Sequence, residues 1–221
     1  MRLRPIAAAA ILLATSGAAI AQEWTEFVSK EDRFSANFPG TPRVTETTYK
    51  SQFGADLPAR AYTAALGPSR FSVTVVDYRP IEKILTEKAK SCPEGAETCK
   101  GGANPGSSTG AGYWKADVAG AIVHATWQYL QRDAKVTTLI WSNIDLVEGH
   151  MLQLTNADKS RTFASIFMHE NKLYLAEATV PAGYPEPGLF QQSLGFVDEN
   201  GKSIRYQTLY HNGFAVPART R

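Results

Sequence analysis

The residue that most resembles a catalytic group is a serine in a glycine-rich stretch. Residues 106–110 read Gly-Ser-Ser-Thr-Gly and match the G-x-S-x-G pattern of hydrolases, with Ser108 in the nucleophile position. That pattern needs a buried strand directly before it, because the sharp strand-to-helix turn presents the serine oxygen. The preceding residues are Lys-Gly-Gly-Ala-Asn-Pro, which cannot form such a strand. We therefore interpret Lys100 to Gly112 as an exposed Gly/Ser-rich loop and predict no catalytic residue.

Histidines are the next candidates, because imidazoles that converge with a carboxylate bind zinc. If Thr155 pairs with Ser160 across a hairpin turn, His150 and His169 lie on neighbouring strands about 13 Å apart. A tight hairpin turn at Glu170-Asn171 puts Lys172 opposite His169, and a cation beside a ligand opposes metal binding. The four histidines are His124, His150, His169 and His211.

Two further histidine environments follow from the sequence. His124 falls among apolar residues in an expected helix, so we interpret it as partly buried. Glu148 and His150 form the best isolated polar pair, at i and i+2 on one strand face. An edge strand exposed to solvent accounts for two polar side chains at these positions without a functional site. We predict neither a metal site nor a cofactor.

Cysteine appears only twice, at Cys92 and Cys99. The six residues between them include proline and glycine and can turn back on themselves. A metal or redox pair is the alternative, but the spacing is not C-x-x-C and no histidine is nearby. We predict a structural disulfide, and closing this short loop is worth ~2.5 kcal/mol on the chain-entropy model.

Large aromatic side chains raise the question of a ligand groove. Trp114, Trp127 and Trp141 could line one for a carbohydrate or an apolar ligand. Core packing is the interpretation we favour, because a helix lying on a sheet needs large side chains.

The first 21 residues have the pattern of a signal peptide. Arg2 and Arg4 precede an apolar run, and Ala19-Ile20-Ala21 is a small-x-small cleavage site. An uncleaved anchor helix is the alternative, but the apolar run is broken and short. Without this segment the 23 basic residues fall to 21, against 21 acidic ones. A neutral chain has no electrostatic footprint for nucleic acid or anionic lipid.

Alternation of apolar and polar residues dominates the first third of the chain. Phe34, Ala36 and Phe38 alternate with polar residues until Pro39-Gly40 ends the strand. Further strands are expected at 43–49, 58–66 and 71–75, and the whole reads as an antiparallel meander. Later strands are expected from residue 136 onward, at 152–155, 161–168 and 173–180.

Helical spacing appears in three places. A short helix is expected from Ile81 toward Cys92. The clearest helix runs from Asp117, a plausible N-cap, to Arg132, with Trp127 and Leu130 widening its apolar face. A last helix starts at Pro187, carries Phe190 and Leu194 on one face, and ends at Gly195.

These elements predict one α+β domain over residues 22–221, a mostly antiparallel sheet flanked by helices. The stretch at about 91–112 stands out as an insertion with the cysteine pair and the Gly/Ser-rich loop.

Several motifs resemble those of the PsbP-like superfamily, and of uncharacterised exported alphaproteobacterial proteins within it. Asn37-Phe38-Pro39-Gly40-Thr41-Pro42 resembles its opening, and Asn171-Lys172-Leu173-Tyr174 its central hairpin. Residues 190–196 (Phe-Gln-Gln-Ser-Leu-Gly-Phe) resemble its closing helix. The resemblance implies an α/β/α sandwich and binding or accessory roles, with no catalytic residue.

Together these observations predict a non-enzymatic accessory protein, periplasmic or secreted, with no membrane anchor after signal cleavage. It would act by binding an envelope protein or a small ligand. The Lys100 to Gly112 loop is a candidate docking surface; the alternative is that this loop is an insertion without a role. A metal-dependent or hydrolytic periplasmic enzyme is the other reading.

Overall fold

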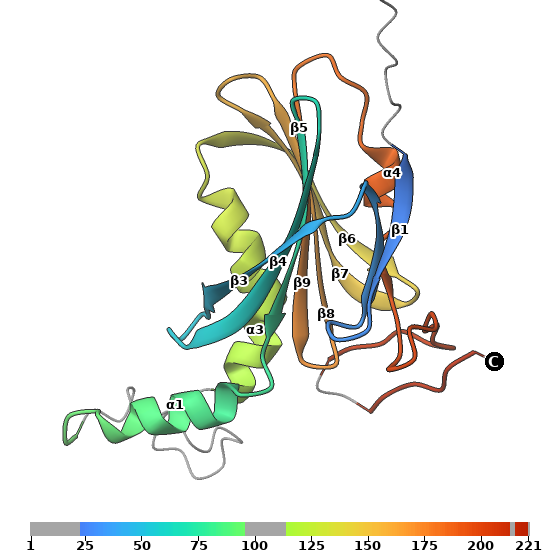
Figure 1. Cartoon of the computed structure of the whole chain (residues 1–221). Coiled ribbons are helices and arrows are strands. Elements are labelled where there is room, and N and C mark those ends of the chain that lie inside the picture. Colours follow the sequence, from blue (N-terminus) through green and yellow to red (C-terminus); the bar gives the residue numbers. More distant parts are fainter. Residues whose placement is uncertain (1–22, 96–113, 213–214, 221) are drawn as a thin grey trace, which may run out of the picture.

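A computed structural model describes residues 23–95, 114–212 and 215–220, and these form one domain (Figure 1). The expected signal peptide, Ser108, Cys99 and most of the predicted insertion lie outside the described residues. The elements are β1 (Trp24–Ser29), β2 (Phe34–Pro39), β3 (Arg43–Lys50), β4 (Asp56–Leu66), β5 (Ser69–Asp77), α1 (Ile81–Lys90), α3 (Trp114–Leu130), β6 (Ala134–Ile144), β7 (Val147–Asn156), β8 (Arg161–His169), β9 (Lys172–Val180), α4 (Gly188–Gln191) and β10 (Gly195–Phe196).

The main body is a seven-stranded sheet in the order β3-β4-β5-β9-β8-β7-β6, and every neighbouring pair is antiparallel. Tight turns join most neighbours. Between β8 and β9, Glu170 and Asn171 have φ of 48° and 56°, as a two-residue hairpin turn requires. The antiparallel arrangement and this hairpin confirm the sequence prediction.

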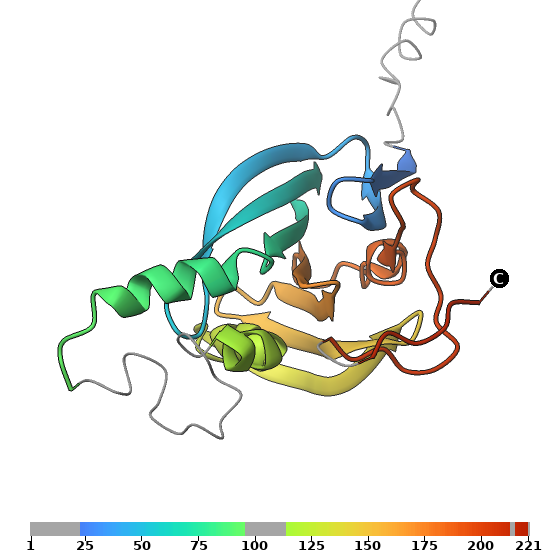
Figure 2. The same ribbon diagram turned by 90° about the horizontal axis from the view of Figure 1, so that it is seen from below.

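The two faces of the large sheet are covered differently. Helix α3 lies against one face, and a small sheet, β1-β2-β10, lies with α4 on the other (Figures 1 and 2). The sequence predicts helices on both faces, but on the second face the short helix α4 is joined by a small sheet. The physical reason for this sheet is the period-two pattern of β2, which buries Phe34, Ala36 and Phe38 completely against the large sheet.

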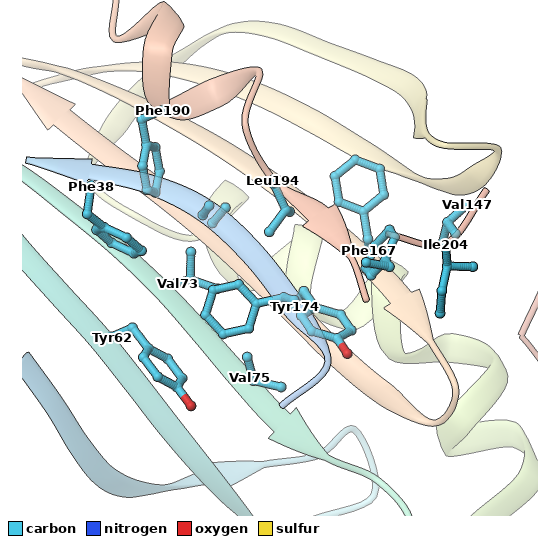
Figure 3. Packing of buried hydrophobic residues seen from close by; sticks show 14 of the residues in the cluster. Phe38, Tyr62, Val73, Val75, Val147, Phe167, Tyr174, Phe190, Leu194 and Ile204 are labelled. Carbon is cyan, nitrogen blue, oxygen red and sulfur yellow. The ribbon is translucent and has the colours of Figure 1, made fainter. Parts of the chain in front are cut away.

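The core between the two sheets is largely aromatic (Figure 3). Phe34 meets Tyr62 edge to face at 4.9 Å between ring centroids, and Phe38 meets Phe190 at 5.5 Å. Phe190 and Leu194 are both buried, as predicted, but α4 ends at Gln191 and Gly195 begins β10. The expected closing helix is thus a single turn followed by a short strand.

Helix α3 differs from its prediction at both ends. It begins at Trp114, so Asp117 is not the N-cap; Asp117 is fully buried instead. Its carboxylate accepts hydrogen bonds from the Ser51 hydroxyl at 2.5 Å and from the backbone N–H of Phe53 at 3.2 Å. Asp117 therefore fixes the β3–β4 turn against the helix.

The apolar face of α3 is narrower than predicted. Ala121, Ala125 and Tyr129 pack on the sheet, whereas Trp127 is 56% exposed and Leu130 37% exposed. The helix is apolar on most of its circumference, so the sequence does not mark which side meets the sheet. The helix at Ile81–Lys90 agrees with its prediction.

Candidate functional site

A buried carboxylate in the β1–β2 turn is the centre of the most elaborate polar cluster. Asp32 is 3% exposed and accepts hydrogen bonds from three side chains. Arg60 donates two, both at 2.7 Å, Tyr62 donates one at 2.6 Å and Lys172 one at 2.8 Å. The Ser29 hydroxyl accepts from the Asp32 backbone N–H at 3.1 Å.

The three donors to the Asp32 carboxylate come from two separate strands. Arg60 and Tyr62 lie at i and i+2 on β4 and therefore share one face, while Lys172 begins β9. Tyr174, two residues further along β9, donates its hydroxyl to the Asp32 carbonyl at 2.9 Å. The cluster therefore ties the small sheet to the large one.

The electrostatics of the cluster hold Asp32 ionised. Burial alone raises the pKa of a carboxyl, but the hydrogen bonds from Arg60, Lys172 and Tyr62 outweigh it and lower the pKa of Asp32 to about 2. Burial, with the Asp32 carboxylate beside it, raises the pKa of Tyr62 to about 12. A carboxylate with this pKa and four donors is a poor general base.

A pocket of about 300 Å³ opens next to this cluster. Four carboxylates and two guanidinium groups line it, with one hydroxyl, from Thr47. The lining residues are Glu31, Asp32, Glu46, Thr47, Pro58, Ala59, Arg60, Val75, Asp77 and Arg79.

Most charges in the pocket are already paired. Arg60 also contacts Glu31, and Arg79 binds Asp77 at 2.6 Å. Glu46 lies directly opposite Arg60 across the β3–β4 pair, is exposed, and has no ion pair within the described part of the chain. The pocket therefore has a surplus of negative charge at Glu46 beside charges that are already paired.

The histidines are not brought together. β7 and β8 pair Thr155 with Arg161, so the register supposed from the sequence is wrong by one residue. His150 consequently faces Ile166, and His169 lies on the opposite face of the sheet. Among the described residues, no three His, Cys, Asp or Glu side chains form a group that could hold a metal ion.

Each histidine has its own environment. His150 Nδ1 lies 2.8 Å from the Thr126 hydroxyl, and burial lowers its pKa. His169 is fully buried; its Nε2 lies 2.7 Å from the Tyr206 hydroxyl, and burial lowers its pKa to about 3. His169 and Lys172 are paired, as predicted.

The two remaining histidines and Glu148 are nearer the surface. His124 is partly buried, as predicted, with its ring edge to face with Tyr49. Glu148 contacts His211 Nδ1 at 2.5 Å rather than His150.

The packing prediction is wrong for two of the three tryptophans. Trp127 on α3 and Trp141 on β6 are 56% and 55% exposed, while Trp114 is half-buried against the helix-side core. Cys92 follows α1, but its expected disulfide partner, Cys99, lies outside the described residues. The disulfide stays a prediction.

Sequence reasoning missed Asp32, Arg60 and Lys172. The local signals are the charged run Lys30 to Arg33 in a turn and a lysine at the start of a largely apolar strand. Neither signal identifies its partner, because Asp32 and Lys172 are 140 positions apart.

Comparison with known proteins gives a distant similarity. The chain is similar to the solution structure of cyanobacterial PsbP (CyanoP) from Synechocystis sp. PCC 6803, with 12% sequence identity and a TM-score of 0.41. The match covers 83% of this chain and 98% of that one, and it concerns the fold alone. No family model and no curated protein matches. Within the described part of the chain, no helix has the length and apolar character needed to cross a membrane.

Proposed function

We propose that this chain is an exported, non-enzymatic accessory protein that acts by binding, with a small polar ligand in the pocket beside Asp32. The observation that carries the proposal is a pocket lined by charged side chains, in which Arg60 is held in place by its ion pair with the buried Asp32 carboxylate. Fixed polar groups favour binding, because little side-chain entropy is lost when a ligand enters. Asp32 does not act as a base toward the pocket's one hydroxyl, from Thr47, because its carboxylate already accepts four hydrogen bonds.

The charge balance of the pocket favours a ligand with a positive group. Arg60 and Arg79 are already paired with carboxylates, which leaves Glu46 as the charge available to a ligand. A primary amine or guanidinium group fits this surplus, since a carboxylate only accepts hydrogen bonds. Export rests on the signal-peptide pattern of residues 1–21.

The test is a binding screen on the chain starting at Gln22. Thermal-shift assays and calorimetry would use small amines and arginine amide, with phosphate and glucose as non-cationic probes. We expect the amines to stabilise the protein, Glu46→Gln to abolish the effect, and Glu26→Gln, at an exposed position of β1 away from the pocket, to leave it unchanged. Binding of phosphate in place of the amines would contradict the charge assignment.

An envelope protein is the second class of partner. If none of the probes binds, the small-ligand form of the proposal fails, and crosslinking in intact periplasm then tests the protein form. A catalytic turnover that depends on the pocket residues would contradict the non-enzymatic proposal as a whole.

A further inference from the structure

One edge of the large sheet is unusually apolar. β6 is the end strand and pairs only with β7 among the described residues, so the outer row of its backbone N–H and C=O groups has no strand partner there. Three consecutive large side chains on it, Leu139, Ile140 and Trp141, are 45%, 51% and 55% exposed. Proteins usually protect such an edge with charges, prolines or bulges. Residues 136–144 contain no charge and no proline, and the only register shift lies at their start.

The opposite edge is protected in the usual way. β3, at the other end of the sheet, carries three charged residues in eight positions. They are Arg43, Glu46 and Lys50. The two edges of the same sheet therefore differ in how they resist pairing with another chain.

On β6, Leu139 and Trp141 lie on the face that α3 covers, because Trp141 is directly opposite His150 and His150 contacts Thr126 of the helix; Ile140 lies on the other face. Helix α3 carries further exposed apolar side chains next to this face. Val123, Trp127 and Leu130 follow at i, i+4 and i+7 and share one stripe of the helix, with Val123 63% exposed.

The extent of this surface lies at the upper end of what a monomer usually shows. Its six large side chains expose on the order of 600 Å², taking about 200 Å² for a whole aromatic side chain. The largest apolar patch of a typical monomer is roughly 300–600 Å². A stable interface covers ~800 Å² per partner. The β6 backbone and neighbouring polar groups would supply the area that the six apolar side chains do not. We define these six residues as the β6–α3 surface.

We infer that the β6–α3 surface binds a second copy of this chain, with the two β6 strands paired antiparallel about a two-fold axis perpendicular to the sheet. Such an axis places each residue against the same stretch of the partner, so like charges would repel. A charge-free segment is therefore the condition for this pairing, and β6 meets it while β3 does not.

The pairing has a definite register. When the axis passes at Ile140, Leu139 of one copy lies opposite Trp141 of the other, a favourable aliphatic–aromatic pair. The Lys135 end of each strand then lies beside Asp145 of the other copy, whose carboxylate also binds Arg205 of its own chain at 3.1 Å. Both α3 helices lie on the same face of the joined sheet and flank Leu139 and Trp141.

This inference does not depend on the pocket beside Asp32. The pocket is lined by β3, β4 and β5, and the inferred interface is at the far edge of the sheet. Loss of self-association and loss of ligand binding are therefore separable outcomes.

Sedimentation velocity of the chain starting at Gln22 tests the inference directly. We expect a dimer at micromolar concentration and, for Ile140→Lys, dimerisation at least about 100-fold weaker because two lysines meet at the axis. Val44→Lys is the matched control, since Val44 is 48% exposed on β3. Circular dichroism would verify that both variants remain folded. A monomeric wild type, or a dimer disrupted by Val44→Lys instead of Ile140→Lys, would overturn the inference.

Crosslinking tests the register. Ile140→Cys places two thiols opposite each other at the axis, where Cα atoms are about 4.5–5.5 Å apart, within disulfide range. We expect an oxidised covalent dimer above the wild-type background and none for Val44→Cys. A dimer that Ile140→Cys cannot crosslink would contradict the antiparallel pairing, and capture of an extended segment of another protein by a monomer would show that the edge has a different occupant.

Discussion

Replacing Asp32 by asparagine removes the carboxylate that contacts Lys172 in the interior. Both side chains are 4% exposed, so the lysine ammonium in the variant stays buried without its directly bonded counter-ion. Removing one partner of a buried pair costs about 3–5 kcal/mol, because the other charge keeps its desolvation penalty. Arg60 is one-quarter exposed and also contacts Glu31, so the loss of its bond to Asp32 adds less to the loss of stability.

Urea unfolding at pH 7 measures this change. We expect the free energy of unfolding of Asp32→Asn to fall by about 3–5 kcal/mol. The double variant Asp32→Asn with Lys172→Met removes the orphaned cation and should recover part of the loss, because coupled residues are non-additive. Glu87→Gln is the control: its ion pair with Lys90 is exposed on both sides, and such pairs are worth about 1 kcal/mol or less.

The free energy of unfolding of the same variant should also depend differently on pH in the acid range. Folding lowers the pKa of Asp32 from 3.8 to about 2, so the unfolded chain binds the proton more tightly. The resulting stabilisation, about 2 kcal/mol, is complete at neutral pH and is lost as the pH falls from about 5 toward 1. Asp32→Asn should lack this part of the acid dependence. A loss below about 1 kcal/mol at pH 7, or an unchanged acid profile, would refute the assignment of Asp32 as the charge that holds the two sheets together.

Three further predictions concern other parts of the chain. Thiol titration of folded, unreduced protein should find no free thiol if Cys92 and Cys99 are bonded; two reactive thiols would contradict the disulfide. Gly149→Ala places a methyl group in steric conflict with the Ile166 carbonyl oxygen, and we expect a loss of more than about 2 kcal/mol in thermal unfolding, with a near-neutral result counting against this close approach. Trp127→Gln should change the stability of the monomer, measured at a concentration too low for self-association, by about 0.5 kcal/mol or less because the indole is largely exposed there, and a large loss would mean that the side chain is packed within the chain.

Local pattern was sufficient for most of the elements. Alternation at Phe34, Ala36 and Phe38 predicts a strand with one buried face, and helical spacing after Ile81 predicts a helix, because both periods follow from backbone geometry. The Glu170-Asn171 turn fixes its hairpin for the same reason, since two residues alone determine the register of the flanking strands.

The sequence did not determine what covers each face. Helix α3 is apolar around most of its circumference, so only packing against the sheet decides that Ala125 is buried and Trp127 exposed. The second face of the large sheet is covered by β1, β2 and β10, and β10 comes from the other end of the chain.

The candidate site belongs wholly to the tertiary structure. Asp32, Arg60 and Lys172 are each unremarkable in the sequence, and their separations of 28 and 140 positions carry no periodic signal. The apolar edge at Ile140 is likewise visible only once β6 is known to be the last strand of its sheet. Period and turn chemistry act over a few residues, whereas the pairing of buried charges and the choice of an edge strand depend on which distant segments the fold brings into contact.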